Sequence, residues 1–139
     1  MPNGWKGKLE SIEGIGSAYA ADLQKGGVES IASLLKRGAT RKGRQEMAQA
    51  TGLSEVRILA WVNRADLYRV KGVGGQYSDL LEQSGVDTAM ELAQRNPKNL
   101  HKTLLETNER CHLVRKVPTE GQVKDWVKYA KTLKRVVEY

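Results

Sequence analysis

The sequence predicts an all-α fold in which two pseudo-repeated halves, residues 9–66 and 67–139, pack into one compact unit of residues 1–139. Helix-capping residues and apolar residues at helical spacing recur along the whole chain. Alternating apolar and polar runs between turns, which would indicate strands, are not visible. The sequence also repeats itself: Leu9–Arg37 placed over Leu67–Arg95, a shift of 58 residues, gives nine identities in 29 positions.

The composition is that of a soluble globular protein, with 40% hydrophobic and 28% charged residues among 139. No apolar run approaches the roughly 20 residues that a membrane-spanning helix needs. Residues 1–9 have no apolar stretch typical of a secretory signal, so we expect a cytoplasmic protein that has no membrane partner. The single cysteine, Cys111, excludes an internal disulfide and a cysteine-rich zinc site.

The charge balance favours a polyanionic partner. Lysine and arginine number 23 against 16 acidic residues, which gives a net charge of +7, and the pI is about 9.6. A surplus of this kind is typical of proteins that bind nucleic acid, although charge alone does not identify the ligand.

Glycines and capping residues delimit the expected helices of the first half. Gly27 follows a short helical stretch, as Gly85 does in the second half, and a left-handed residue at such a place commonly ends a helix. Thr40 is predicted to cap a helix that ends at Gly52. Ser54 caps the next helix, whose expected apolar face comprises Val56, Leu59, Val62 and Ala65.

Three further helices are expected in the second half. Thr88 and Glu91 form a capping-box pattern, and Asn96 followed by Pro97 is a typical helix start. The apolar face behind Pro97 comprises Leu100, Leu104 and Leu105. The last helix opens with the box Thr119–Gln122, and its expected apolar face is Val123, Trp126, Val127, Ala130, Leu133 and Val137. Its other side carries a basic stripe of Lys124, Lys128, Lys131 and Arg135.

Both halves contain a turn of the form apolar-x-Gly-apolar-Gly, at residues 12–16 and 70–74. Two glycines permit a sharp reversal with positive φ, and the apolar residue between them is expected in the core. The amides that follow lie at the start of a helix, where unsatisfied N–H groups and the helix dipole favour a phosphate. The predicted contact residues are Gly14, Ile15, Gly16 and Ser17 in the first turn and Lys71, Gly72, Val73, Gly74 and Gly75 in the second.

The two turns resemble the helix-hairpin-helix motif, a SAM-like arrangement. That motif has a small residue four positions after the second glycine, which is met by Ala20 and Ser78, and an apolar residue three positions further, met by Leu23 and Leu81. The resemblance implies that each hairpin holds the backbone of one DNA strand without reading its bases. The spacing of 58 residues places additional helices between the two turns.

A longer pattern covers most of the chain. It comprises Ile12–Gly16, Trp61–Leu67, Lys71–Gly74, Glu91–His101 and Val117–Trp126. These segments resemble a bacterial family catalogued only as a domain of unknown function (DUF4332). The resemblance implies a helical fold and DNA binding, and it implies no established activity.

A basic cluster provides a second group of candidate phosphate contacts, namely Lys36, Arg37, Arg41, Lys42 and Arg44. Cations near the start of a helix oppose its dipole, and a bound anion would remove that penalty. A solvated loop explains the cluster equally well. Between the two turns we favour the second, because Lys71 attracts phosphate where the first turn carries Glu13.

Two functions from different classes follow from these patterns. The first is binding of DNA, expected to be double-stranded, through backbone phosphates and without sequence preference. The second is a protein-interaction adaptor with structural hairpins, which would recruit a protein partner through an apolar groove between the halves.

Catalytic chemistry is not expected, and no cofactor or metal is implied. His101 and His112 have no second ligand at metal spacing, and adjacent Cys111 and His112 point apart on a helix. The Gly-x-Gly turns have neither the preceding strand nor the third glycine of a dinucleotide fingerprint. A nucleic-acid lyase would need a lysine placed for Schiff-base chemistry, and we expect no such activity.

Overall fold

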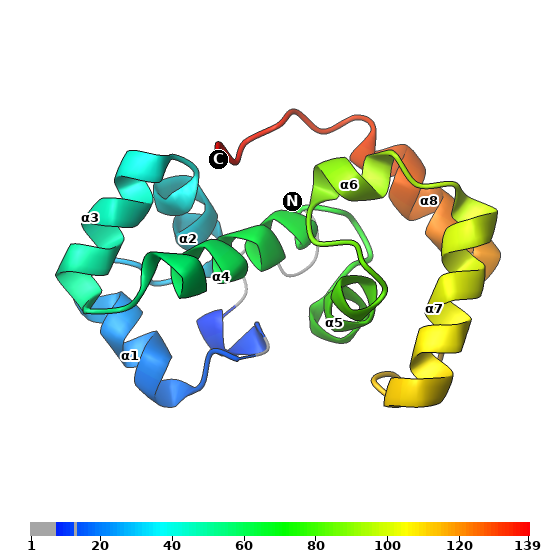
Figure 1. Ribbon diagram of the computed structural model, residues 1–139, viewed down its shortest axis with the longest axis horizontal. Coiled ribbons are helices and arrows are strands. Elements are labelled where there is room, and N and C mark those ends of the chain that lie inside the picture. The colour runs from blue at the N-terminus through cyan, green and yellow to red at the C-terminus, as the bar shows by residue number, and fades with distance from the viewer. Residues whose placement is uncertain (1–7, 13) are drawn as a thin grey trace.

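The computed structural model describes residues 8–12 and 14–139, and within them every regular element is a helix, which confirms the all-α prediction (Figure 1). Glu13 lies outside the described residues. The elements are the 3-10 helix η1 (Leu9–Ser11) and the α-helices α1 (Ser17–Lys25), α2 (Ile31–Gly38), α3 (Arg41–Thr51), α4 (Glu55–Leu67), α5 (Gly75–Gln83), α6 (Ala89–Ala93), α7 (Pro97–Cys111) and α8 (Glu120–Ala130). No described helix has the length and apolar character needed to cross a bilayer.

Side-chain caps start most of these helices where the sequence predicts them. In α3, α4, α6, α7 and α8 the cap oxygen accepts a hydrogen bond from the amide three residues later, as predicted for Thr40, Ser54, Thr88, Asn96 and Thr119. The box at the start of α8 is complete, because the Thr119 amide also donates to Gln122 Oε1 at 2.8 Å. Helix α2 begins with a box that was not predicted from the sequence, formed by Ser30 and Ser33.

Among the described residues, the buried apolar side chains form two clusters, one mainly within residues 9–68 and the other within residues 67–130. The first cluster draws on η1 and α1–α4, and the second on α5–α8 and the end of α4. In each cluster a tyrosine ring packs against a tryptophan ring, with centroids 5.2 Å apart for Tyr19–Trp61 and 5.1 Å apart for Tyr77–Trp126. Figure 1 shows α1–α3 grouped around α4 and α5–α8 beyond the C-terminal end of α4.

The end of α4 connects the two clusters. Leu67 belongs to the second cluster, whereas Tyr68, next in the chain, belongs to the first. Arg64 is 6% exposed and forms ion pairs with Asp79 and Glu82 of α5. The contacts of this one helix therefore position the start of the second half against the first.

The C-terminal segment returns from the second half to the first. Val137 is 3% exposed and packs in the first cluster, and the Glu138 amide donates to the Ala39 carbonyl at 2.7 Å. Tyr139 Oη donates to Asn63 Oδ1 at 2.7 Å. Residues 131–139 thus form a second connection between the halves, next to α6 in Figure 1.

This path corrects the predicted extent of the last helix. Helix α8 ends at Ala130, and Lys131 is its C-terminal cap. The prediction that the helix continues to Val137 is wrong, because Val137 is buried in the core of the other half, which a helical path would not reach. The predicted basic stripe is therefore shorter, with Lys124 and Lys128 on the helix and Arg135 in the irregular segment.

Two apolar residues are on the wrong side of their predicted helices. Val56 is 82% exposed, because the buried face of α4 contains Ile58, Trp61, Val62 and Ala65, and a residue two positions before Ile58 points away from that face. Leu105 is 36% exposed, since it follows the buried Leu104 by one residue, about a quarter turn around α7.

Candidate nucleic-acid interface

The two glycine turns have the same backbone geometry. Gly14 has φ +93° and Gly72 has φ +91°, values that favour glycine. The side chains of Ile15 and Val73 are 3% and 0% exposed, which confirms their predicted place in the core. Their amides donate within the turn, to Ile12 O at 3.1 Å and to Val70 O at 3.0 Å. These two predicted contact residues therefore offer a ligand neither an amide nor a side chain.

The helices that follow the turns begin without a side-chain cap. Gly16 and Gly74 are the N-caps of α1 and α5, and neither helix has a capping hydrogen bond from a side chain. All other described α-helices have one. The residues at these two starts, Gly16, Ser17, Gly74 and Gly75, are exposed or half-exposed. Uncapped amides at the positive end of a helix dipole provide donors for an anion.

The fold brings the second turn against the segment that leads into the first. Gly75, the first residue of α5, lies against η1: a Cβ atom on it would be 3.0 Å from the Ser11 carbonyl oxygen. The same carbonyl accepts a hydrogen bond from Tyr68 Oη at 2.7 Å. Figure 1 shows η1 and α5 as neighbours in the middle of the molecule. The two turns are 58 residues apart in the sequence. In space, the second turn lies next to the segment that leads into the first.

Each turn is followed by a tyrosine three residues after its second glycine, namely Tyr19 and Tyr77. A basic residue contacts each of these tyrosines. In the first half Arg57 donates to Tyr19 Oη, and its guanidinium lies 4.8 Å from the centroid of the Tyr19 ring. In the second half Tyr77 Oη donates to the Lys116 carbonyl at 3.1 Å. Arg57 was not predicted from the sequence, because its contact with Tyr19 is tertiary and no local spacing indicates it.

The second turn borders a hollow of about 450 Å³. Its lining combines the glycines of the turn with two exposed cations: Gly72, Gly74, Gly75, Gln76, Tyr77, Arg115 and Lys116. The loop that carries Arg115 and Lys116 is well braced, because Asn108 exchanges two hydrogen bonds of 3.0 Å with Val114. The site thus places guanidinium and ammonium groups near the uncapped start of α5.

Lys71 lies at a second hollow beside the same turn. This hollow has a volume of about 410 Å³ and is lined by Lys71, Gly72, Gln122, Asp125, Trp126 and Tyr129. Lys71 is exposed, as the phosphate-contact prediction requires. Asp125 is also exposed and brings an opposing negative charge to this hollow.

Some side chains of the basic cluster in residues 36–44 are exposed, and others donate hydrogen bonds to backbone carbonyls. Lys36, Arg41 and Lys42 are exposed. Arg37 is half-buried, and its guanidinium donates to the Gly26 carbonyl at the end of α1. Three members thus remain accessible to a ligand, and Arg37 has a structural partner.

Arg44 corrects the prediction for this cluster. It is 4% exposed, and its guanidinium donates to Gly38 O at 2.7 Å, to Ala39 O at 3.3 Å and to Glu138 O at 2.6 Å. Arg44 therefore satisfies carbonyls at the end of α2 and in the C-terminal segment, and it is not an exposed phosphate contact.

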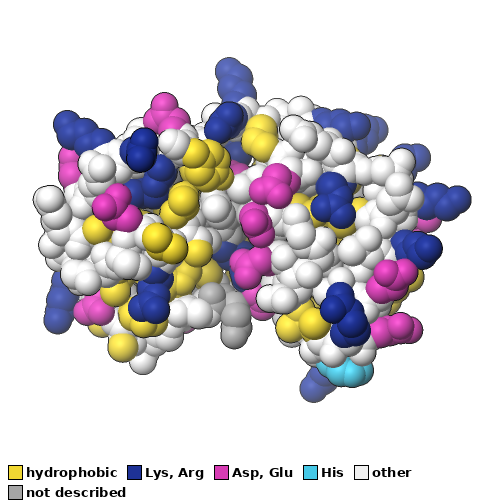
Figure 2. All heavy atoms as spheres, viewed as in Figure 1, with side chains coloured by type: hydrophobic (Ala, Val, Ile, Leu, Met, Phe, Trp, Pro, Cys, Tyr) yellow, Lys and Arg dark blue, Asp and Glu magenta, His cyan; other side chains and the backbone are white. Residues whose placement is uncertain are grey.

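The exposed members of this cluster lie away from the glycine turns. Gly26 after α1 lies against Thr51 at the end of α3, so these two helix ends are neighbours. From there the helices diverge, and the start of α3 lies at the opposite edge of the first half from the start of α1 (Figure 1). On the face in Figure 2, Lys and Arg side chains are spread around both halves, and acidic side chains gather near the middle.

The described residues contain no group of three His, Cys, Asp or Glu side chains placed to hold a metal ion. The exposed Cys111 and the left-handed His112 follow one another at the end of α7.

Comparison with known proteins gives one match. The sequence profile of the family described as Domain of unknown function (DUF4332) matches residues 13–133. No curated protein and no solved structure matches the chain. The matched range covers most of the 139 residues and contains both glycine turns except for Ile12. The chain therefore belongs to the DUF4332 family.

Proposed function

We propose that this protein binds DNA through the phosphate backbone, without reading the base sequence, and that its two glycine turns are helix-hairpin-helix motifs. The observation that carries the proposal is the contact between Gly75 and the Ser11 carbonyl, which draws the two halves together beside their uncapped helix starts. A repeating polyanion offers phosphates to both starts at once, which a small anion does not.

The local structure of each turn supports this assignment. The 3-10 helix η1 leads into the first turn, and the end of α4 with the turn residues 68–70 leads into the second. Each turn then has a glycine of positive φ and is followed by a helix of nine residues. Amides at the start of a helix bind phosphate oxygens, and arginine and lysine nearby neutralise the charge. Contacts of this kind fix the position of a protein on DNA and carry no sequence information.

The cations of the proposed interface are Arg57, Lys71, Arg115 and Lys116 beside the turns, with Lys36, Arg41 and Lys42 as an outer group. We assign the larger share of the affinity to the first group, because it lies beside the helix starts. Double-stranded DNA is the proposed ligand, since two adjacent turns can each hold one strand.

The test compares two pairs of charge-removing substitutions by fluorescence anisotropy with a labelled duplex of random sequence. Arg115→Gln with Lys116→Gln is expected to weaken binding and to make the slope of log affinity against log salt shallower, by about 0.9 for each phosphate that is no longer neutralised. Arg41→Gln with Lys42→Gln removes the same charge from the outer group and is expected to have the smaller effect. Equal effects of the two pairs would show that only net charge matters, and no effect of either would contradict the proposal.

A protein-interaction adaptor is the second candidate, and an apolar hollow favours it. The hollow has a volume of about 500 Å³ and lies where α2 meets the C-terminal segment, lined by Ser30, Ala32, Ser33, Leu35, Lys36 and Val136. Val136 is 36% exposed there. For an adaptor, Val136→Asp abolishes capture of the protein partner and leaves duplex binding unchanged, whereas the Arg115 and Lys116 substitutions leave capture intact.

A further inference from the structure

We infer that Trp126 is a ligand-contact residue whose indole N–H donates a hydrogen bond to a phosphate oxygen at the second turn. This inference rests on the proposed function, and it adds a side-chain donor to the backbone amides and cations already assigned. It also specifies the ligand as a polynucleotide backbone rather than an isolated phosphate.

The indole nitrogen lies directly below the second glycine turn. Trp126 is 3% exposed and packs in the second core cluster. A Cβ atom on Gly72 would be 3.0 Å from Trp126 Nε1. Gly72 itself is exposed, so the missing side chain leaves a gap in the surface above the N–H group. Any larger residue at position 72 would cover it.

The Trp126 N–H has no hydrogen-bond partner among the described residues, and the ring of this side chain packs on Tyr77. A tryptophan N–H in a folded protein usually has an acceptor. Among the described residues the buried side-chain nitrogens that lack a hydrogen-bond partner are Arg64 Nε and Arg69 Nη2, so the Trp126 nitrogen itself is accessible from the surface. An accessible donor that has no protein partner can therefore donate to an acceptor of a bound ligand.

The arrangement occurs twice. In the first half Trp61 is 6% exposed, and its Nε1 would be 3.6 Å from a Cβ atom on Gly14. Its ring packs on Tyr19 in the same way, and its N–H likewise has no partner among the residues that the structure describes. An indole N–H without a protein partner therefore lies below the first glycine of each turn.

The surroundings of Trp126 specify the chemistry of the ligand. The hollow that Trp126 lines also contains Lys71, which attracts an anion, and Asp125, which opposes one. Gly72 borders this hollow and the neighbouring hollow of Arg115 and Lys116. A single phosphate ion occupies one hollow, whereas successive phosphates of a nucleic-acid strand can reach both.

The first experiment follows the Trp126 indole N–H resonance of the ¹⁵N-labelled full chain by NMR, with Trp126→Phe used for assignment. Addition of a random-sequence duplex is expected to shift this resonance and to slow its exchange with water. Inorganic phosphate at the same phosphate concentration is expected to leave it in place. The second experiment is duplex anisotropy, in which Trp126→Phe is expected to weaken binding about tenfold and Asp125→Asn to strengthen it.

Tyr139→Phe is the matched control, because it also removes one donor from an aromatic side chain but lies on the C-terminal segment; it is expected to bind like the wild type. Salt-sensitive duplex binding by the wild type with an unmoved Trp126 resonance would overturn the inference and leave the proposed function intact. An absence of duplex binding by the wild type would overturn both. If Trp126→Phe does not fold, the inference is tested by whether the Trp126 N–H resonance of the wild-type protein shifts when duplex is added.

Discussion

Gly75 and Ser11 are in contact, although 64 positions separate them in the sequence: a Cβ atom on Gly75 would be 3.0 Å from the Ser11 carbonyl oxygen and 3.1 Å from Tyr68 Oη. Gly75 is the first residue of α5 and Ser11 the last of η1. The close approach joins the second turn to the segment that leads into the first. The relative position of the two proposed phosphate sites depends on this contact.

Gly75→Val is therefore expected to destabilise the protein by about 1–3 kcal/mol, because the added side chain overpacks the junction with Ser11 and Tyr68. The free energy of unfolding in urea measures the effect. Gly121→Val provides the control, since Gly121 also lies in the first turn of a helix but has only Thr119 Oγ1, at 3.8 Å, near its Cβ position. Equal stability of the two variants would show that the two halves are not in close contact there.

Gly72→Ala is expected to cost more stability than Gly52→Ala. Both glycines have positive φ, +91° and +76°, so both variants incur the left-handed penalty of about 1–2 kcal/mol. A Cβ atom at position 52 meets nothing within 4 Å, whereas at position 72 it lies 3.0 Å from Trp126 Nε1. Urea unfolding compares the two variants, and a smaller cost at position 72 would contradict the placement of the indole.

Much of the fold could be predicted from the sequence because its signals are local. A cap such as Thr119 with Gln122 depends on residues three positions apart, and Gly27 and Gly85 have the positive φ expected after a helix. The end of α8 could not be predicted in this way. The apolar spacing through Val137 fits a helix, but burial of Val137 in the first core cluster stabilises another path.

The candidate site was predicted in part, for the same reason. The glycine turns are local patterns, so their residues were found. Arg57 and Arg115 reach the turns through tertiary contacts with Tyr19 and at the hollow beside Tyr77, and no local spacing indicates either contact. Arg44 was misassigned because a charge in sequence does not reveal that carbonyls from α2 and the C-terminal segment surround it.

Arg44→Gln is expected to destabilise the protein by about 2–3 kcal/mol, since carbonyl oxygens of Gly38 and Glu138 lose a charged donor in a buried place. Arg41→Gln removes an exposed charge at the start of the same helix, where a cation opposes the dipole, and is expected to cause no loss. Thermal and urea unfolding measure both variants. If only Arg41→Gln lowered the free energy of unfolding by this amount, Arg41 would be the structural residue and Arg44 the accessible one, contrary to the assignment made here.

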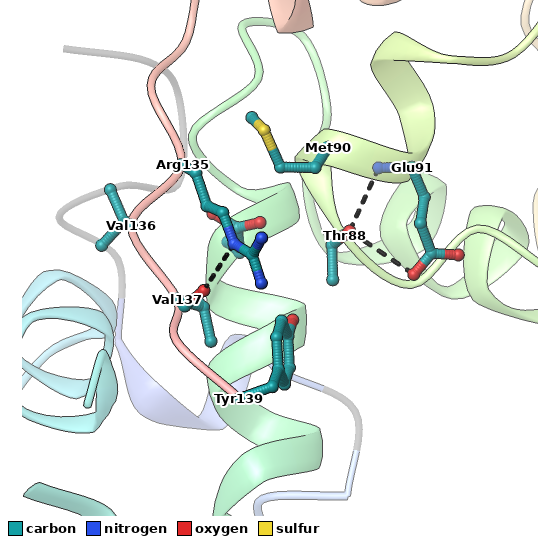
Figure 3. Close-up of a pocket in the computed structure, with 8 residues that line it drawn as sticks. Thr88, Met90, Glu91, Arg135, Val136, Val137 and Tyr139 are labelled. Atoms are coloured by element: carbon teal, nitrogen blue, oxygen red, sulfur yellow. Dashed lines mark hydrogen bonds between the residues drawn. The ribbon is translucent and has the colours of Figure 1, made fainter. Parts of the chain in front are cut away.

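The attachment of the C-terminal segment is expected to weaken at alkaline pH. Burial raises the pKa of Tyr139 above the ordinary value of 10.0, and the carboxylates of Asp66 and Glu91 reinforce the shift. These groups surround the pocket of about 230 Å³ that Tyr139 and Arg135 line (Figure 3). Because the folded protein holds this proton more tightly than the unfolded chain, the stabilisation is complete below pH 10.0 and is lost as the pH rises through the raised pKa.

Tyr139→Phe tests this pH dependence, because it removes the hydroxyl that donates to Asn63 Oδ1. The wild type is expected to exceed the variant in unfolding free energy below pH 10.0, and the difference is expected to shrink above it. A difference that stays constant through the alkaline range would show that the Tyr139 proton does not stabilise the segment.

The affinity of the wild-type protein for a random-sequence duplex, measured by anisotropy over a range of salt concentrations, tests the central claim most directly. If two adjacent turns hold the phosphate backbone with four or more contacts, log affinity falls linearly with log salt, with a slope of about −3.6 or steeper. A slope near zero, or no binding at low salt, would contradict backbone binding and leave the glycine turns with a structural role.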